Sequence, residues 1–372
     1  MVKKILVTGG AGFIGSHVVD ELLEHGYEVR VLDSLSEQVH GDKRERPDYL
    51  SDDAELMVGD VRNKEDVKNA LRGVDAVYHF AACVGVGQSM YQIERYTDVN
   101  NRGTAVLLEC LIDQPIKKLV VASSVSIYGE GRYVDDGDNH HDDAKRTPEQ
   151  LKNGDWEVYS MSGNELKPVP TPESKTPELS SIYALSKYDQ EKMCLIAGRA
   201  YDIPTVALRF FNAYGSRQAL SNPYTGVLAI FASRLMNGKP PLIFEDGKQQ
   251  RDFVHVFDVA QACRLALEVP EAENEVFNVA SGDCYTISQL AEHMASVLGR
   301  DDLKPEITGK YRVGDIRHCT GDIDKARRVL GYKPRINLEE GTRELVAWLN
   351  GQVATDHSTE ATEELTARGL AL

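Results

Sequence analysis

The sequence lacks three features that would place it in other classes of protein. It has no apolar run near the roughly 18 residues that a membrane-spanning helix needs. Positive charge is scarce, with 42 lysines and arginines against 58 acidic residues, which argues against a nucleic-acid partner. The six cysteines include no CxxC pair, as expected of free thiols in a reducing compartment. Residues 1–4 lead into a predicted strand rather than a signal peptide. We therefore expect a cytoplasmic protein with neither membrane nor nucleic acid as a partner.

Glycine is plentiful near the N-terminus, in a pattern with a physical use. Residues 4–8 are predicted to form a short buried strand, GGAGFIG at 9–15 follows at once, and a helical pattern begins there. Such a unit brings backbone N–H groups to a pyrophosphate at the helix N-terminus. The next predicted strand ends in Asp33, whose carboxylate can accept a hydrogen bond from a ribose 2′-hydroxyl. No arginine follows at 34–36 to neutralise a 2′-phosphate, so the cofactor is predicted to be NAD rather than NADP. The cofactor contacts predicted here are Gly9, Gly12, Phe13, Ile14, Gly15 and Asp33.

Further apolar strands alternate with helical stretches in the first half of the chain. They are predicted at 55–58, 76–80, 119–122 and 205–208. This alternation is typical of a parallel doubly wound sheet, whose ligands lie outside the carboxyl ends of the strands. Asp60 follows one such end and can accept a hydrogen bond from an adenine amino group. The cofactor contacts predicted at these ends are Asp60, Val61, Phe80, Ala81, Ala82 and Ser123.

Tyr183 and Lys187 form the candidate catalytic pair. If Ser180 or Ser181 caps a helix there, the pair lies four residues apart on one helical face. A lysine ammonium at that distance favours the phenolate and lowers the pKa of the tyrosine, as a general base requires. The YxxxK pattern is common by chance, so its weight comes from the glycine-rich unit that precedes it.

A series of motifs in a fixed order resembles the extended short-chain dehydrogenase/reductases that act on nucleotide sugars. The resemblance covers residues 1 to about 350. The motifs are TGGAGFIG (8–15), LD (32–33), GDV (59–61), FAA (80–82), VNNRGT (99–104), ASSVSIYG (122–129), YALSK (183–187), RFFNAYG (209–215), RDFVHVFDVA (251–260), FNVASG (277–282) and LGYKP (330–334).

The resemblance implies an α/β fold with a Rossmann-type doubly wound parallel sheet and a smaller, discontinuous α/β substrate-binding lobe. Segments 254–259 and 276–279 are expected to return to the sheet. A homodimer is implied, through a bundle of helices around 93–113 and 181–200. The expected parts are an NAD-binding domain (1–208 and 253–280), a nucleotide-sugar-binding lobe (209–252 and 281–350) and a C-terminal tail (351–372). The last segment is expected to be either a free tail or one loosely docked helix.

Position by position, the resemblance also assigns roles to side chains. Tyr183 would be the base and acid at the sugar hydroxyl, and Lys187 would also bind the nicotinamide ribose. Ser124 would hydrogen-bond the reacting oxygen, and Asn100 and Phe210 would lie beside the cofactor. The implied substrate contacts are Ser89 and Ser124 at the hexose, Asn212, Arg251 and Arg317 at the diphosphate, and Phe244 at the nucleoside.

The residues after Ser124 separate the reaction types of the family. Its 4,6-dehydratases carry an Asp–Glu pair there and its decarboxylating members typically a Glu at the second position, but this chain has Val125 and Ser126. Without that acid and base, hydride chemistry at C4 remains, and Ser124, Ser126, Tyr183 and Lys187 form the predicted catalytic set. The resemblance therefore implies a 4-epimerase, in which bound NAD⁺ oxidises C4 and the 4-keto sugar is re-reduced on its other face.

Residues 132–172 form an insertion that is long by the standard of the family. It is polar with little periodicity, and we expect a structureless loop near the sugar pocket. Within it, 140–143 (HHDD) has no spaced partner residues, so we predict no metal site. The insertion and segments 85–91 and 243–247 resemble those of dTDP-L-rhamnose 4-epimerases. Thr225-Gly226, in contrast, stand where many members have a substrate-contacting asparagine.

The predicted reaction converts dTDP-L-rhamnose to dTDP-6-deoxy-L-talose. Epimerisation of UDP-glucose or UDP-glucuronate at C4 is the alternative reaction. A different class is a scaffold that binds NAD(H) without turnover. Such scaffolds generally lose the tyrosine or the lysine, whereas this chain keeps Tyr183 and Lys187.

Overall fold

The computed structural model describes residues 2–42, 44–219, 222, 224, 226–352, 356 and 358–372. At its centre is a seven-stranded sheet in which neighbouring strands run parallel, in the order β14-β9-β5-β4-β1-β2-β3. The chain order reverses between β1 and β4, which is where doubly wound folds bind their ligands. The strands are β1 (Lys4–Thr8), β2 (Glu28–Asp33), β3 (Glu55–Val58), β4 (Ala76–His79), β5 (Lys118–Ser124), β9 (Thr205–Phe210) and β14 (Val276–Val279).

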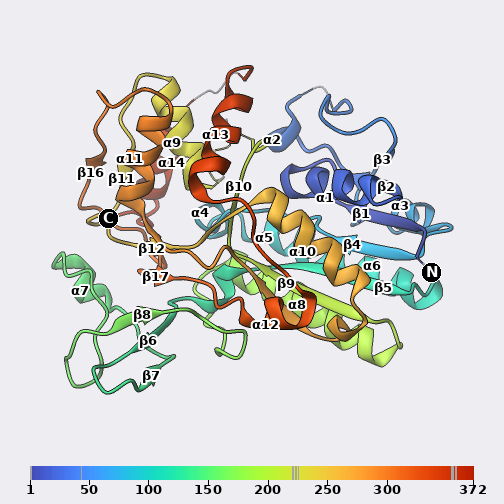
Figure 1. Cartoon of the computed structure of the whole chain (residues 1–372), viewed down its shortest axis with the longest axis horizontal. Helices are drawn as coiled ribbons and strands as arrows, with labels where there is room; N and C mark the ends of the chain where they lie inside the picture. The colour runs from blue at the N-terminus through green and yellow to red at the C-terminus, as the bar shows by residue number, and fades with distance from the viewer. Residues whose placement is uncertain are drawn as a thin grey trace.

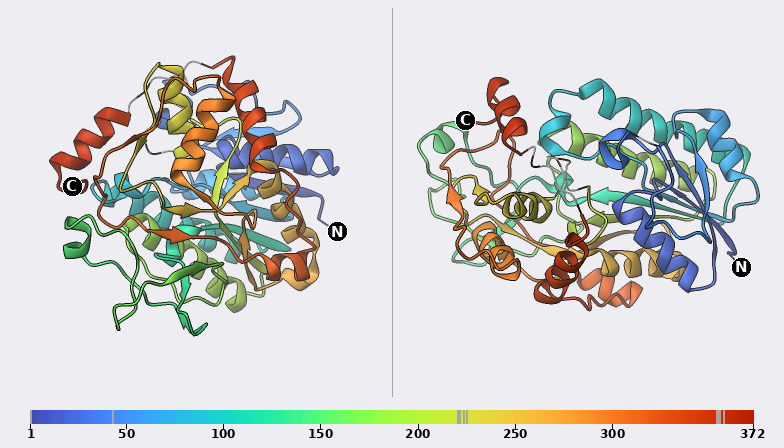
Figure 2. Two further views of the ribbon diagram at one scale, coloured as in Figure 1. Left: turned by 60° about the vertical axis from the view of Figure 1, so that its left-hand side comes forward. Right: turned by 90° about the horizontal axis from the view of Figure 1, so that it is seen from above.

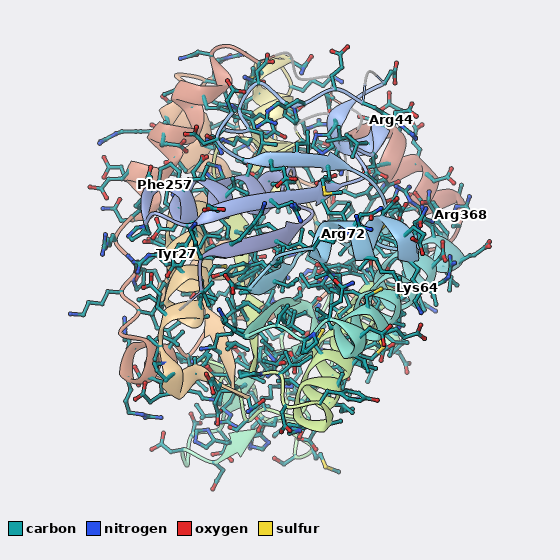
Figure 3. The ribbon with its side chains drawn as sticks, turned by 90° about the vertical axis from the view of Figure 1, so that its right-hand side faces the viewer. Tyr27, Arg44, Lys64, Arg72, Phe257 and Arg368 are labelled. Carbon is teal, nitrogen blue, oxygen red and sulfur yellow. The ribbon has the colours of Figure 1, made fainter. Side chains whose placement is uncertain are left out.

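Two layers of helices cover this sheet, because alternate residues of a strand face opposite sides. The layers are α1 (Phe13–Glu24) with α10 (Val256–Glu268), and α3 (Lys64–Leu71) with α6 (Gly103–Asp113) and α8 (Ile182–Ala200). In β1, Ile5 and Val7 join the apolar cluster of α1 and α10, whereas Leu6 joins that of α3, α6 and α8. The right-hand view of Figure 2 shows both layers, and Phe257 of α10 and Lys64 of α3 lie on opposite sides in Figure 3. The predicted Rossmann-type fold is confirmed.

The prediction that 254–259 returns to the large sheet is wrong. Instead β13 (Phe253–His255) pairs in parallel with β10 (Asn212–Tyr214), and α10 begins at Val256. Buried apolar residues recur from Val256 to Leu267 at the three- and four-residue spacing of a helix, so the short apolar run belongs to a longer helical pattern. β14 does join the sheet, as predicted.

A smaller lobe is built around a third apolar cluster, which includes Tyr214, Phe231, Leu290 and Leu345. It draws on the two segments from which we predicted a discontinuous substrate lobe. Besides β10 and β13, its elements are α9 (Val227–Met236), α11 (Ile287–Val297), α13 (Leu338–Leu349), β11 (Leu242–Ile243) paired with β16 (Glu306–Ile307), and β12 (Gln250–Arg251) between β15 (Tyr285–Thr286) and β17 (His318–Cys319).

The insertion at 132–172 is folded, contrary to the expectation of a structureless loop. Its elements are β6 (Arg132–Val134), which pairs antiparallel with β7 (His140–His141) and β8 (Lys167–Val169), and α7 (Pro148–Lys152). Tyr133, Val158 and Leu166 form a small core of its own. In Figure 1 this unit projects at the lower left. Strands of two or three residues are too short to show a periodicity, which is why the sequence did not reveal them.

The C-terminal segment contains a docked helix, which is one of the two arrangements expected for it. This helix is α14 (Ser358–Ala367), in which Ala361 and Leu365 are buried. Across the described ranges, no helix is both long and apolar enough for a bilayer crossing. The same ranges hold no group of three His, Cys, Asp or Glu side chains placed for a metal. The remaining elements are α2 (Glu37–His40), α4 (Val86–Ser89), α5 (Ile93–Tyr96), the π-helix η1 (Thr97–Arg102), the 3₁₀ turns η2 (Val125–Tyr128) and η3 (Pro270–Ala272), and α12 (Asp324–Leu330).

Candidate active site

A cavity of about 950 Å³ lies between the carboxyl ends of the sheet strands and the smaller lobe. Most of the predicted site residues line it, although they come from distant parts of the chain. Those at its wall are Gly9, Gly12, Phe13, Ile14, Gly15, Asp33, Asp60, Val61, Phe80, Ala81, Ala82, Ser123, Ser124, Ser126, Tyr183, Lys187, Phe210, Asn212, Phe244 and Arg251.

The glycine turn before α1 is shaped to hold an anion. Gly9 has a φ of +72°, and a Cβ on Gly15 would lie 2.2 Å from the carbonyl oxygen of Gly9, so the turn needs glycine at both positions. Within the described range 2–42, no side chain caps α1 and its first turn has no acidic residue. The N–H groups at this helix end are therefore left for a ligand such as a pyrophosphate.

Two carboxylates stand where we expected the adenosine half of a dinucleotide. Asp33 accepts hydrogen bonds from the backbone N–H groups of Ala11 (3.0 Å) and Leu35 (2.9 Å), which hold it at the end of β2. Asp60 pairs with the guanidinium of Arg62 at 2.6 Å, and this hydrogen bond lowers the pKa of Asp60. Both side chains line the cavity, so they fit acceptors for ribose and adenine groups.

The predicted catalytic set meets where α8 packs against the end of β5. The hydroxyl of Ser181 caps α8 by accepting from the N–H of Ala184, which places Tyr183 and Lys187 in successive turns of one helix. Ser124 ends β5, and the Ser126 hydroxyl donates to its Oγ at 2.9 Å. The predicted serine, tyrosine and lysine therefore share one part of the cavity wall.

The electrostatics of the pair differ from our expectation. Burial raises the pKa of Tyr183, and a hydrogen bond with Ser124 only partly opposes this. The Lys187 ammonium donates instead to Oε1 of Gln190 at 2.7 Å, and burial lowers the pKa of Lys187 to about 8. The predicted lowering of the tyrosine pKa by the lysine is therefore not a property of this arrangement. Gln190, which the sequence did not single out, holds the lysine.

Asn100 and Ser89 lie behind the wall of the cavity rather than at it. The amide of Asn100 donates to Ser186 (2.9 Å) and accepts from the N–H of Cys83 (2.7 Å), and its side chain is fully buried. Ser89 Oγ accepts from the N–H of Tyr183 at 3.0 Å and is also fully buried. Neither residue, predicted to contact the cofactor and the hexose respectively, lines the cavity; each holds another part of its wall.

The far wall carries side chains suited to a nucleoside diphosphate. The Arg312 guanidinium stacks over the Phe244 ring at 4.4 Å, and both line the cavity. Asn212 donates to the carbonyl of Asp252 (2.9 Å), and Arg251 donates to the carbonyl of Ile316 (2.5 Å). Aromatic faces suit bases, and guanidinium groups suit phosphates.

Arg317, predicted at the diphosphate, does not line the cavity. Its side chain is 0% exposed and pairs with Glu157, Glu245 and Asp246. Arg312 is the cavity-facing arginine of this segment, and the sequence analysis missed it. Both arginines lie in an irregular stretch before β17, where no periodicity shows which side chain faces a cavity.

Comparison with known proteins places the chain in a family. The model of the NAD dependent epimerase/dehydratase family matches residues 5–150 and 153–280. The chain belongs to this family. It is 33% identical to a dTDP-L-rhamnose 4-epimerase of Burkholderia thailandensis, over 93% of this chain and 95% of the relative.

Two solved structures support the same placement. The UDP-glucose 4-epimerase of Thermotoga maritima, solved with UDP-glucose, is 33% identical with a TM-score of 0.75 and covers 93% of this chain and 98% of its own. The UDP-glucose 4-epimerase of Thermus thermophilus, solved with NAD, is 31% identical with a TM-score of 0.73, covering 94% and 100%. This chain is thus an NAD-dependent enzyme of the nucleotide-sugar epimerase family.

In this epimerase-family enzyme, the C-terminal segment closes one side of the cavity. Ala361, Leu365 and Leu370 line it, and Leu365 lies 3.3 Å from where a Cβ on Gly87 would be. Backbone hydrogen bonds from Tyr311 and Val313 to the last residues of the chain hold the segment in place. No sequence pattern indicated this role, since the segment is polar and short. Of the pair Thr225-Gly226, which stands where many family members have an asparagine, Gly226 lines the cavity and Thr225 lies outside the described residues.

Burial of Lys187 carries a cost that a mutation should reveal. Because its pKa falls from 10.5 in its ordinary state to about 8 in the fold, charging it below pH 8 costs about 3 kcal/mol. We expect Lys187→Met to stabilise the cofactor-free enzyme by about 2 kcal/mol near pH 7, after the loss of the Gln190 hydrogen bond. The gain should vanish near pH 10, where the unfolded chain also begins to lose this proton.

Urea unfolding of the variant and the wild type at the two pH values measures this difference. Lys192→Met, an exposed lysine of the same helix, serves as the control and should change stability little at either pH. If Lys187→Met changed the free energy of unfolding by the same amount at both pH values, the lowered pKa of Lys187 would be contradicted.

Proposed function

We propose that this chain is an NAD-dependent nucleotide-sugar 4-epimerase that interconverts dTDP-L-rhamnose and dTDP-6-deoxy-L-talose. The observation that carries the proposal is that Ser124, Tyr183 and Lys187 line one cavity with the glycine turn. Val125 and Ser126 stand where an acid–base pair would be needed for elimination. Reversible oxidation at one carbon is the chemistry that this set of groups supports.

The side chains divide the work at the 4-hydroxyl. Tyr183 accepts the hydroxyl proton as C4 becomes a ketone, and returns it when the opposite face is reduced. Ser124 donates a hydrogen bond to the same oxygen, and Lys187, held by Gln190 one helical turn from Tyr183, is placed for the nicotinamide ribose. Bound NAD supplies the hydride acceptor and donor. The balance closes without an external reductant, because each turnover ends with the cofactor in its starting state.

The apolar side of the cavity supports a 6-deoxysugar as the substrate. Val84, Val86 and Leu365 line it near the catalytic tyrosine's helix. A C6 methyl group is favoured by such a surface, whereas a hydroxyl or carboxylate would lose its hydrogen bonds to water there. The relative from Burkholderia supports the same substrate.

UDP-glucuronate is a second candidate, and one residue favours it. Arg95 lies in the same cavity wall and could pair with a C6 carboxylate. UDP-glucose remains the alternative supported by the Thermotoga structure. A scaffold without turnover is disfavoured, since the tyrosine and lysine are both present in the wall.

A substrate panel tests the proposal. Purified enzyme would be incubated with dTDP-L-rhamnose, UDP-glucose and UDP-glucuronate without added reductant, and the products followed by NMR. We expect conversion of dTDP-L-rhamnose to be the fastest. Faster conversion of a UDP-sugar would replace the substrate, and conversion of none would overturn the epimerase assignment.

We also propose a homodimer through α5, η1, α6 and α8. Four apolar side chains on these helices, Ile93, Ile112, Leu185 and Ile196, are between 42% and 59% exposed. Apolar surface of this kind on neighbouring helices suits a helical bundle between two copies. Sedimentation equilibrium would show a monomer if the proposal is wrong.

The contact of α14 with the cavity leads to a prediction for substrate affinity. Leu365→Ala removes methyl groups from the wall, and we expect KM for the nucleotide sugar to rise about five- to tenfold with little change in kcat. Glu363→Ala, at an exposed position of the same helix, is the matched control. Steady-state kinetics of both variants measure this effect. Equal KM values for Leu365→Ala and Glu363→Ala would show that α14 does not contribute to substrate binding.

A further inference from the structure

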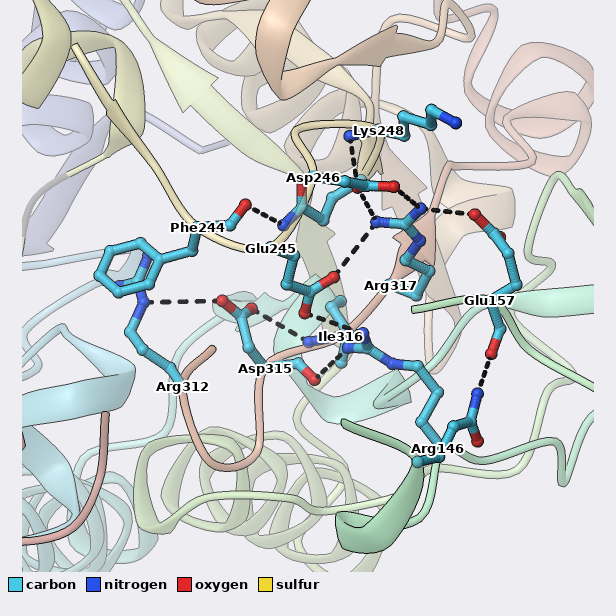
Figure 4. Close-up of polar contacts among 12 residues, drawn as sticks. Arg146, Glu157, Phe244, Glu245, Asp246, Lys248, Arg312, Asp315, Ile316 and Arg317 are labelled. Carbon is cyan, nitrogen blue, oxygen red and sulfur yellow. Dashed lines mark hydrogen bonds and ion pairs between the residues drawn. The ribbon is translucent and has the colours of Figure 1, made fainter. Parts of the chain in front are cut away.

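Arg146 connects the insertion to the wall that faces the substrate. Its guanidinium is 2% exposed and donates to Glu245 at 2.8 Å and to the carbonyl of Asp315 at 3.0 Å. It also donates to Glu130, which follows the catalytic end of β5, at 3.3 Å. One side chain of the insertion therefore bonds three segments that are far apart in the sequence. Figure 4 shows its bonds to Glu245 and Asp315.

A second arginine extends this connection. Arg317 donates to both oxygens of Asp246, at 2.6 and 2.9 Å, and to Glu157 of the insertion at 2.5 Å. Its backbone N–H donates to Glu130. The insertion thus supplies one cation, Arg146, and one anion, Glu157, to a network that is otherwise made by the wall itself.

The network reaches the side chains that line the cavity. Asp315 lies between two of them, 3.7 Å from Arg312 and 3.5 Å from Arg251. Glu245 and Asp246 directly follow Phe244, whose ring lies against Arg312. Figure 4 shows Phe244 and Arg312 at one side of the network, and Arg146 and Glu157 at the other.

We propose that the insertion positions the diphosphate-binding wall of the substrate site, with Arg146 as the positioning residue. It acts through Asp315 on Arg251 and Arg312, and through Glu245 on Phe244. The proposal rests on the proposed function, because it takes a nucleoside diphosphate as the ligand of that wall. It gives the insertion a role in affinity for the nucleotide part of the substrate rather than in the chemistry at C4.

The ion pairs of the network explain why loss of Arg146 would change the cavity wall. Without Arg146, Glu245 would be left buried beside only Arg317, and the carbonyl of Asp315 would lose its donor. A buried carboxylate that loses one of its two guanidinium partners is destabilised, so either the segment that carries it moves towards water or the carboxylate takes up a proton. Either change would shift the segment that holds Phe244 and the loop that holds Arg312.

The test compares two arginines of the insertion. Arg146→Ala is expected to weaken binding of dTDP and UDP, measured by titration calorimetry, at least tenfold, while NAD binding stays within about twofold. KM for the sugar nucleotide should rise with kcat changed less than about threefold, and Arg146→Lys should restore part of the affinity. Arg132→Ala is the matched control, because Arg132 pairs with Asp142 inside the insertion and should leave nucleotide binding unchanged.

Glu157→Gln keeps the test decisive if Arg146→Ala fails to fold. Glu157 is partly exposed, and its loss leaves Arg317 paired with Asp246 and Glu245, so this variant should fold and bind dTDP and UDP several-fold more weakly. Equal losses for Arg146→Ala and Arg132→Ala, or wild-type binding in the Glu157 variant, would overturn the proposal. Calorimetry with dTDP and UDP measures binding without turnover. A failure of the wild type to convert any sugar nucleotide would therefore count against the proposed reaction and not against the role of Arg146.

Discussion

Replacing Tyr183 with phenylalanine is expected to lower kcat by about 10³-fold, within the range for loss of a general acid–base. The ring would keep its place on α8, where it packs edge to face with Tyr96 at 6.4 Å, so the fold should survive. Only the hydroxyl that takes and returns the proton is lost. Steady-state turnover of the dTDP- and UDP-sugars measures the effect, with melting temperature as the check on folding.

The matched control is Tyr188→Phe, on the same helix but outside the cavity, where the ring lies under Lys192. That variant should keep nearly all of its activity. Turnover of Tyr183→Phe within tenfold of the wild type would remove the tyrosine from the mechanism and require a different base.

The second large effect is expected at the glycine turn. Gly12→Ala should weaken NAD binding at least 100-fold, or by about 3 kcal/mol, because the methyl group would enter the space that a pyrophosphate needs. The fold should be unaffected, since the added Cβ meets only the Gly9 carbonyl oxygen, at 3.4 Å. Calorimetric titration with NAD, beside thermal melting, separates these two effects.

Gly15→Ala gives the contrasting result. Its Cβ would lie 2.2 Å from the Gly9 carbonyl oxygen, so the turn itself has to open and both NAD affinity and melting temperature should fall. Gly351→Ala, where a Cβ meets nothing within 4 Å, is the neutral control. If Gly12→Ala binds NAD normally, the turn does not hold the cofactor in the way described.

The parts of the site that could be predicted are those whose chemistry is local in the sequence. The glycine turn, Asp33 and the Tyr183/Lys187 pair each depend on a spacing within one strand–turn–helix unit or one helix. The large sheet was predictable for a similar reason, because buried runs such as β1 and β5 are apolar along most of their length. Even there, the apolar run at 254–259 was wrongly predicted to be a strand of the large sheet, because short apolar runs occur both in helices and in buried strands.

Contacts between distant segments could not be predicted. The sequence offers Arg312 and Arg317 five positions apart, and only the packing of β17 against the insertion buries the second and turns the first to the cavity. Asn100 and Ser89 show the same limit. Both residues are close in sequence to residues that line the cavity. Their polar atoms, however, form hydrogen bonds with backbone or side-chain groups behind the cavity wall.

The sequence by itself determined the family, the cofactor and the absence of an acid–base pair beside Ser124, because these follow from residue types at short spacings. The tertiary structure decided which arginine faces the cavity, how the insertion at 132–172 is tied to the cavity wall, and that α14 closes one side of the cavity. These depend on ion pairs and apolar contacts between segments up to about 280 residues apart, such as Gly87 and Leu365. No local pattern records such contacts, since their free energy arises only when the chain is folded.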